Sequence, residues 1–223
     1  MSASEIVTTP GAREGVRVER VITRGVFALD GGEWEVDNNI WIVGDDSEVV
    51  VIDAAHEAGP ILEALNGRKV TAIVLTHGHN DHINASAEVA AATGAPRWIN
   101  AADRMLWDAE FGDVAPDGEL TDGQIIEVAG LPLTVIHTPG HSPGGVCLHS
   151  AELAVLFSGD TLFAGGPGAT GRSFSDFDTI LTSISDRLLT LPGETLVLTG
   201  HGDSTTIGAE APHRQRWIDE HDG

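Results

Sequence analysis

The sequence predicts an α/β fold, in which short buried strands alternate with helices, and three observations support this prediction. Apolar runs rich in Val and Ile, such as residues 49–52 and 70–75, have the length and composition of buried strands. Residues 177–191 carry apolar side chains at spacings of three and four, which is typical of a helix packed on one face. The two halves of the chain repeat one order: hairpin strands, a strand that ends in Asp or His, and a helix.

The first half is predicted to open with a β-hairpin. Residues 16–29 and 35–43 are its strands, and Asp30-Gly31-Gly32 is a turn-forming sequence between them. The helix after residue 75 is predicted to begin near Asp81 or Asn84 and to continue through a run of alanines to Ala92. The other elements predicted in this half are a strand at 49–52, a helix over 59–65, a strand at 70–75, a strand at 96–99 and a helix over 101–108.

The second half begins with residues 111–120, a stretch rich in Gly, Asp and Pro that is predicted as a loop overhanging the functional site. The elements predicted after it are strands at 125–128, 131–136, 146–149, 153–157 and 195–199, with helices over 177–191 and 209–220. The sequence contains no linker-like or low-complexity tract, and 223 residues can bury a sizeable core. We therefore expect residues 1–223 to form a single domain.

Composition excludes several classes of protein. The net charge of −22, with Lys69 as the one lysine, argues against nucleic-acid binding, because phosphates favour clusters of Lys and Arg. No apolar run is long enough to span a membrane, and residues 1–17 lack the apolar segment of a secretory signal, so a cytoplasmic protein is expected. The single Cys147 excludes an intramolecular disulfide, and its apolar strand predicts a buried, inert thiol. The sequence carries no signal for an oligomeric state.

The most informative stretch follows the strand at 70–75, where His77, His79, Asp81 and His82 fall within six residues. The carboxyl ends of strands are where open α/β sheets bind ligands. Imidazole and carboxylate are preferred ligands of zinc and related divalent ions. In an extended turn His77 and His79 can converge on one ion, while Asp81 and His82 begin the helix and point to a neighbouring position. The alternative is a polar loop that is merely rich in histidine, which this spacing disfavours.

Two further residues suggest supporting roles. Asp53 also ends a buried strand, where it is predicted to accept a hydrogen bond from a metal-bound histidine or, alternatively, to cap the helix over 59–65. His56 is expected at the mouth of the pocket or in a surface loop. Arg172 lies in a glycine-rich loop over 164–172 that lacks the phosphate-binding motif with its lysine, and this loop is expected to form one wall of the pocket. Arg172 is predicted to bind an anionic group of the substrate or to pair with surface carboxylates.

His77-Gly78-His79-Asn80-Asp81-His82 resembles, without a mismatch, the His-x-His-x-Asp-His signature of the metallo-β-lactamase superfamily. Three later stretches resemble the other ligand loops of this family, namely Thr138-Pro139-Gly140-His141, Ser158-Gly159-Asp160-Thr161 and Gly200-His201-Gly202. The resemblance implies a four-layer αβ/βα sandwich. It also implies one metal ion on His77, His79 and His141, a second ion on Asp81, His82 and His201, and Asp160 as a bridge between them.

Within the superfamily, the chain is most similar to small glyoxalase-II-like hydrolases, in residues 159–163, 171–173 and 200–208. This resemblance implies hydrolysis of a thioester of a low-molecular-weight thiol by a hydroxide between two divalent ions, with Asp81 orienting the water. Zinc is the expected metal, and iron or manganese would also suit the ligands. Related actinobacterial proteins are associated with mycothiol. Larger glyoxalases II hold glutathione with a C-terminal helical domain, tyrosine and lysine, and this chain has no tyrosine, so a different thiol is expected.

Three other functions remain open from the sequence. A persulfide dioxygenase of the same fold would use a single iron, here on His77, His141 and Asp160. A lactonase would use the paired ions, although the tyrosine that several lactonases place near the metals is absent. The third is a non-catalytic metal-binding or redox-partner module, which the histidine-rich ligand set and the missing flavin domain disfavour. Measuring metal content alongside hydrolysis and oxygen uptake separates these functions.

Overall fold

Two mixed β-sheets lie face to face in the computed structural model, which describes residues 4–222. The strands of the first sheet are, in spatial order, β1 (Glu5–Val7), β2 (Arg17–Leu29), β3 (Gly32–Gly44), β4 (Glu48–Ile52), β5 (Lys69–Val74), β6 (Arg97–Ile99) and β7 (Gly118–Glu119). Those of the second are β15 (Thr205–Thr206), β14 (Leu196–Thr199), β11 (Val155–Gly159), β10 (Val146–Ser150), β9 (Leu131–His137) and β8 (Ile125–Val128). A short ribbon joins β12 (Leu162–Phe163) to β13 (Gly166–Pro167).

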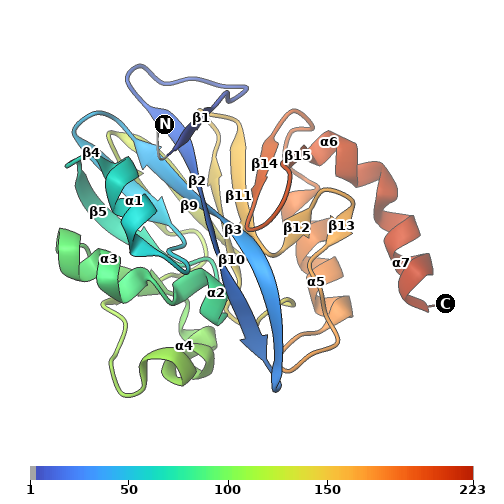
Figure 1. Cartoon of the computed structure of the whole chain (residues 1–223). Coiled ribbons are helices and arrows are strands. Elements are labelled where there is room, and N and C mark those ends of the chain that lie inside the picture. The colour runs from blue at the N-terminus through green and yellow to red at the C-terminus, as the bar shows by residue number, and fades with distance from the viewer. Residues whose placement is uncertain (1–3, 223) are drawn as a thin grey trace.

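The helices cover the outer faces of the two sheets. They are α1 (Ala58–Leu65), α2 (Asn80–Ile83), α3 (Ser86–Thr93), α4 (Arg104–Phe111), α5 (Phe177–Ser183), α6 (Ile207–Glu210) and α7 (Arg214–Asp222). Figure 1 shows α1 and α3 outside the first sheet and α5 and α7 outside the second. The molecule is therefore an αβ/βα sandwich of four layers, and the predicted fold class is confirmed.

Side chains along each strand alternate between two apolar layers, because successive residues of a strand point to opposite faces. In β3, Trp41 and Val43 face the second sheet, while Ile40 and Ile42 pack with residues of α1 and α3. On the far side of the second sheet, Cys147 packs with residues of α5 and α7. Each sheet is thus buried on both faces, which explains why its central strands are continuous apolar runs in the sequence.

Parallel strand pairs bring the polar strand ends together. Strands β4 and β5 are parallel with Ile52 opposite Val74, and β11 and β14 are parallel with Gly159 opposite Thr199. The carboxyl ends of parallel neighbours lie at the same edge of a sheet. The residues that follow these four strands therefore meet at one edge of the sandwich, where α/β proteins bind their ligands.

The hairpin turn has the predicted position. Leu29 pairs with Gly32, so Asp30 and Gly31 are the two turn residues, and their φ angles are 54° and 77°. Two positive φ angles match the twist of the flanking strands, as in the favoured two-residue hairpins. Strands β2 and β3 are 13 residues long, and their distal halves extend beyond the body of the first sheet (Figure 1).

The helix predicted to begin near Asp81 or Asn84 and to reach Ala92 is in fact two helices, α2 and α3, and side-chain hydrogen bonding explains the break. A continuous helix would need the Ala85 N–H to bond to the Asp81 carbonyl. Instead, the Asp81 carbonyl accepts a hydrogen bond of 2.7 Å from Asn38 Nδ2, and the Ala85 N–H donates to the Ala54 carbonyl at 3.0 Å. Alanine propensity alone predicts a continuous helix, but these tertiary contacts override it.

Three other predicted helices differ locally from the structure. The helix predicted over 177–191 is α5 followed by a π-helical turn over residues 184–188, in which the Leu189 N–H bonds to the Ile184 carbonyl. The predicted terminal helix is interrupted by a 3₁₀ turn over residues 211–213 that contains Pro212, whose ring nitrogen has no hydrogen to donate. The helix predicted over 101–108 begins with a 3₁₀ turn and ends later, as α4.

The segment 111–120 was predicted to overhang the site, and this prediction is wrong. Its residues 118–119 form β7 on the edge of the first sheet, and Leu120 is buried between the two sheets. The segment therefore packs at the sheet edge, where Leu120 is buried, and not over the ligand loops. Among residues 4–222, no helix has both the length and the apolar character needed to cross a bilayer. The expectation for residues 1–17 includes residues 1–3, which lie outside the described residues.

Candidate metal centre

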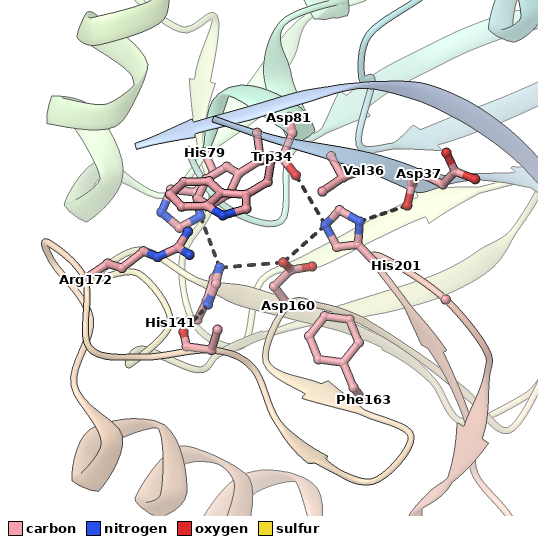
Figure 2. Close-up of a pocket in the computed structure, with 13 residues that line it drawn as sticks. Trp34, Val36, Asp37, His79, Asp81, His141, Asp160, Phe163, Arg172 and His201 are labelled. Atoms are coloured by element: carbon pink, nitrogen blue, oxygen red, sulfur yellow. Dashed lines mark hydrogen bonds and ion pairs between the residues drawn. The ribbon is translucent and has the colours of Figure 1, made fainter. Parts of the chain in front are cut away.

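Seven polar side chains from four segments converge at one edge of the sandwich. Their positions are His77 and His79 after β5, Asp81 and His82 on α2, His141 between β9 and β10, Asp160 after β11 and His201 after β14. Figure 2 shows the ring of His79 turned towards His141, that of His141 towards Asp160, and that of His201 between Asp81 and Asp160. The structure thus brings together every residue for which the sequence predicts a ligand role, while the role itself stays a prediction.

One group consists of three histidines. His79 Nδ1 lies 2.9 Å from His77 Nε2 and 3.1 Å from His141 Nε2. A proton can link two ring nitrogens, but it cannot satisfy three that face one point. Three imidazole nitrogens that converge in this way are instead suited to a divalent cation.

A second group lies beside the first. His82 Nε2 and His201 Nε2 are 3.2 Å apart, and Asp81 Oδ2 lies 3.3 Å from His201 Nε2 and 3.7 Å from His82 Nε2. The four-residue helix α2 supplies both Asp81 and His82, and both side chains are buried. This group offers one carboxylate and two imidazoles to a cation.

Asp160 contacts both groups. Its Oδ1 lies 3.3 Å from His82 Nε2, and its Oδ2 lies 3.4 Å from His201 Nε2 and 3.6 Å from His141 Nε2. Asp81 Oδ1 is buried without a hydrogen-bond partner among the described residues, and the contact of Asp160 Oδ1 with His82 Nε2 lacks the geometry of a hydrogen bond. Buried carboxylate oxygens are costly unless they are paired or bind a metal, so the residues present fit a pair of divalent ions.

Hydrogen bonds on the outer side of the rings fix their orientation. His141 Nδ1 donates to the Ala169 carbonyl at 2.8 Å, and His201 Nδ1 donates to the Asp37 carbonyl at 2.9 Å. Because a carbonyl only accepts, these bonds place a hydrogen on Nδ1 and leave the Nε2 lone pair of each neutral ring facing inward. Acceptors of this kind commonly orient metal-bound histidines.

Asp53 holds two of the rings. Its Oδ2 lies 2.8 Å from His82 Nδ1 and also accepts a hydrogen bond of 2.9 Å from Thr76 Oγ1, which in turn lies 3.2 Å from His77 Nδ1. The alternative role as a helix cap is not observed, because α1 begins after Glu57. Asp53 therefore has the contacts of a residue that orients ligand histidines.

The electrostatic environment shifts histidine pKa values in opposite directions in the two groups. Burial lowers the pKa of His79 to about 3, assisted by the neighbouring His141, and it lowers that of His77 well below the ordinary value. Burial also opposes a charge on His201, but Asp160 and Asp81 outweigh it and raise the pKa of His201 to about 10. Without ions, His77 and His79 are therefore neutral, whereas His201 carries a proton that balances the carboxylates.

The sequence analysis missed Asn38, which is completely buried beside the second group. Its Nδ2 donates to the Asp81 carbonyl at 2.7 Å and to Asp81 Oδ2 at 3.2 Å, and its Oδ1 accepts a hydrogen bond of 2.7 Å from His56 Nε2. His56 does not line the cavity; it lies in the loop between β4 and α1, where it is half-buried against Gly25. An asparagine in the middle of an apolar strand is the signal that could have revealed this contact.

The sequence analysis also missed Asp103, which ties two ligand loops together. Its carboxylate accepts hydrogen bonds from the Gly78 N–H at 2.8 Å, from Ser142 Oγ at 2.7 Å and from the Gly144 N–H at 2.5 Å. Gly78 lies between His77 and His79, and Ser142 follows His141. The spacing of the first group thus depends on one carboxylate that sequence spacing does not identify.

A cavity of about 490 Å³ opens onto both groups. Its lining includes Phe27 and Trp34 from the β2–β3 hairpin, Phe163 from β12, and Ala169 and Arg172 from the glycine-rich loop. The loop therefore forms a wall, as predicted, but the hairpin takes the place that was expected for residues 111–120. Aromatic walls around a few convergent polar groups are typical of sites for small molecules.

Known proteins share this sequence and fold. The sequence profile of the metallo-beta-lactamase superfamily matches residues 34–201. Hydroxyacylglutathione hydrolase GloC of Haemophilus influenzae is 32% identical over 186 residues, which cover 77% of this chain and 87% of that protein. The structure of BLEG-1, described as a B3 metallo-beta-lactamase, is 30% identical, covers 86% of this chain and 98% of its own, and superposes with a TM-score of 0.73. TTHA1623 in a di-iron-bound form is 33% identical, covers 79% and 93% of the two chains, and has a TM-score of 0.68. The profile match spans most of the chain and includes six of the seven converging side chains, with His201 at its boundary. The relatives cover more than two thirds of the chain. The protein therefore belongs to the metallo-β-lactamase superfamily.

Proposed function

We propose that the protein is a hydrolase dependent on two divalent metal ions, and that it cleaves thioesters of a low-molecular-weight thiol. The observation that carries the proposal is the contact of the Asp160 carboxylate with both groups of converging side chains. The name of the relative GloC, a hydroxyacylglutathione hydrolase, supports an acylated thiol as substrate. Zinc is the first candidate metal, and the di-iron form of TTHA1623 makes iron the second.

The ions would be held by His77, His79 and His141 on one side and by Asp81, His82 and His201 on the other, with Asp160 between them. When bound, such ions act as Lewis acids and lower the pKa of water to about 7, so that hydroxide is present at neutral pH.

The residues of the chain supply position and proton transfer. Asp81 Oδ1, which has no hydrogen-bond partner among the described residues, would accept a hydrogen bond from the attacking water. Asp53 keeps the ring of His82 in place through its bond of 2.8 Å to Nδ1. The aromatic lining of the cavity excludes bulk water from the carbonyl group. A thiolate is a good leaving group, so the reaction needs no strong general acid.

The proposal is tested by metal reconstitution followed by assays on several substrates. The protein is stripped with a chelator, loaded with zinc, iron or manganese, and assayed for metal content and for hydrolysis of lactoyl, formyl and acetyl thioesters of glutathione and mycothiol. Asp160→Ala should remove metal and activity together, whereas Asp178→Ala, which changes an exposed carboxylate on α5, should change neither. A fully loaded protein that cleaves lactones or β-lactams but none of these thioesters would contradict the proposal.

A persulfide dioxygenase is the second candidate, with a single iron on His77, His141 and Asp160. The burial of Asp81 and His82, which this reaction leaves unused, favours the hydrolase. Oxygen uptake with a thiol persulfide by protein loaded with one iron per chain, together with failure to hydrolyse thioesters, would reverse this preference.

A further inference from the structure

Asn38 and His56 form a hydrogen-bonded pair beside the second group, and neither takes part in the proposed reaction. Asn38 lies in β3 and is completely buried, whereas His56 lies in the loop between β4 and α1 and is half-buried. Buried polar side chains are normally paired, and both ends of the Asn38 amide have partners in other segments, His56 at one end and Asp81 at the other. The pair therefore joins β3, the loop after β4 and α2.

These contacts fix the orientation of the Asn38 amide. The Asp81 carbonyl only accepts hydrogen bonds, so the atom of Asn38 that lies 2.7 Å from it must be the nitrogen, Nδ2. The amide oxygen then faces His56. Because that oxygen also only accepts, His56 Nε2 must carry the hydrogen of the bond of 2.7 Å between them. His56 thus holds the amide in the orientation that directs its N–H groups to Asp81.

The loop that carries His56 has an uncommon backbone conformation. The φ angle of His56 is 61°, in the left-handed region that residues other than glycine rarely adopt. Its N–H donates to Asn84 Oδ1 at 2.6 Å, and its ring packs so closely on Gly25 that a Cβ there would lie 2.1 Å from Nδ1. Asp53 in the same loop also has a φ of 61°, and its carboxylate orients the ring of His82. Conformations of this kind persist where the surrounding contacts impose them, and they are frequent at functional sites.

The Asn38 amide contacts the second group and not the first. Its Nδ2 lies 3.2 Å from Asp81 Oδ2, 3.3 Å from His82 Nε2 and 3.4 Å from His201 Nε2. Within the described part of the chain, every polar contact of this side chain goes to these three residues or to His56. An effect of the amide on metal binding should therefore be confined to the second group.

We infer that Asn38, held by His56, positions the Asp81 carboxylate and so sets the affinity of the second group for its ion. The inference rests on the two-ion site of the proposed function and adds two positioning residues to it. Residues that hydrogen-bond to metal ligands keep them oriented before the ion binds. Without the amide, the ion itself would have to order the Asp81 side chain, and its binding would be weaker. Among the described residues, His56 Nε2 bonds to Asn38 alone, so His56 acts through Asn38.

Stepwise zinc affinities test the inference. Ion-free protein is titrated with zinc in competition with a chromogenic chelator, which yields one affinity for each ion. His141→Ala, which removes a ligand of the first group only, identifies the step that belongs to the second group. The variants are Asn38→Leu, which has a similar shape without polar atoms, His56→Phe, which keeps a ring without a donor, and the double variant. His149→Phe is the matched control, because His149 is a half-buried ring on β10, outside the site.

Asn38→Leu should lower the zinc affinity of the second group about ten-fold or more and leave that of the first group little changed. His56→Phe should lower the affinity at the same step about ten-fold, and it tests the inference by itself if Asn38→Leu does not fold. The double variant should bind zinc no more weakly than Asn38→Leu, because effects that pass through one residue do not add. His149→Phe should match wild type. Equal losses at both groups, or additive losses in the double variant, would show that the pair only supports the fold, and the inference is overturned.

The titration is independent of the proposed reaction. Urea unfolding of the ion-free variants first establishes that each is folded, and thioester hydrolysis is assayed separately. A loss of affinity at the second group alone supports the inference even if the loaded wild-type protein cleaves no thioester. Wild-type zinc affinity at the second group in both Asn38→Leu and His56→Phe overturns the inference even if thioesters are cleaved.

Discussion

Asp103→Asn should loosen the three-histidine group without touching a ligand. The side chain is fully buried, and its Oδ2 accepts hydrogen bonds from the Gly78 N–H and Ser142 Oγ, while its Oδ1 accepts one from the Gly144 N–H. Asparagine has the same shape but only one oxygen. If that oxygen faces Gly78 and Ser142, the amide group of the new side chain meets the Gly144 N–H, and one buried donor loses its acceptor.

The size of the effect follows from these contacts. An unsatisfied buried donor costs about 1–3 kcal/mol. Burial raises the pKa of Asp103, which means that the fold disfavours its charge, and a neutral amide avoids that cost. The two effects oppose each other, so we expect Asp103→Asn to lower the free energy of unfolding by about 1–2 kcal/mol. Asp103→Ala loses all three bonds and should cost about 3–5 kcal/mol.

Two measurements test this prediction. Urea unfolding of the ion-free protein reports the stability, and competition with a chelator reports the affinity for each ion. We expect the affinity of the three-histidine group to fall about ten-fold in Asp103→Asn, as is typical when a supporting residue is lost, with little change at the other group. The control Asp108→Asn changes an exposed carboxylate on α4 that pairs with Arg104. Asp103→Asn values that match this control in both measurements would refute the reasoning.

Three further predictions concern other parts of the molecule. Gly200→Ala should lower the metal content and reduce activity at least ten-fold, because a Cβ there would lie 2.2 Å from Asp160 Oδ1. Elemental analysis measures the metal content, with Gly59→Ala, whose Cβ meets nothing within 4 Å, as the control. The pKa of His201 is raised from 6.5 to about 10, so its stabilisation of the ion-free protein is complete below pH 6.5 and is lost as the pH rises towards 10. The melting temperature of ion-free protein should therefore fall across this window, and an equal fall in the melting temperature of a His201→Gln variant would contradict the assignment. Burial raises the pKa of Cys147 to about 11, so iodoacetamide should label the unfolded protein at least about 100-fold faster than the native one, and equal rates by mass spectrometry would show that the thiol is accessible.

The sequence predicts those parts of the site that depend on residues close together in the chain. His77 and His79 follow one buried strand, and their spacing already brings their rings together. The paired strand ends at Ile52 and Val74 lie at the same edge because parallel strands share a direction, which the order of elements also implies. Local pattern and strand direction were therefore enough to find the loop that carries His77 and His79, whereas the loops of His141, Asp160 and His201 were found through their resemblance to motifs of the family.

Contacts between distant segments could not be predicted in the same way. Asn38 lies 43 positions before Asp81, and its contact depends on the register of β3 against α2, which no local rule determines. Residues 111–120 have loop composition, but composition does not say where a loop packs. Here the buried Leu120 and the hydrogen bond of 2.6 Å from Trp107 Nε1 to the Val114 carbonyl hold the segment at the sheet edge.

These distant contacts determine how the site can respond to metal. The rings of His82, His141 and His201 are each held from behind by an acceptor, at 2.8–2.9 Å, that involves no metal. Metal binding therefore needs little rearrangement of the rings. Its main cost at the second group is removal of protons from His82 and His201, because the neighbouring carboxylates raise the pKa of both rings. In the first group, His77 and His79 have no such proton to lose near neutral pH, because burial lowers their pKa values. Affinity should thus rise more steeply with pH at the second group than at the first, so that at low pH the three-histidine group fills before its neighbour.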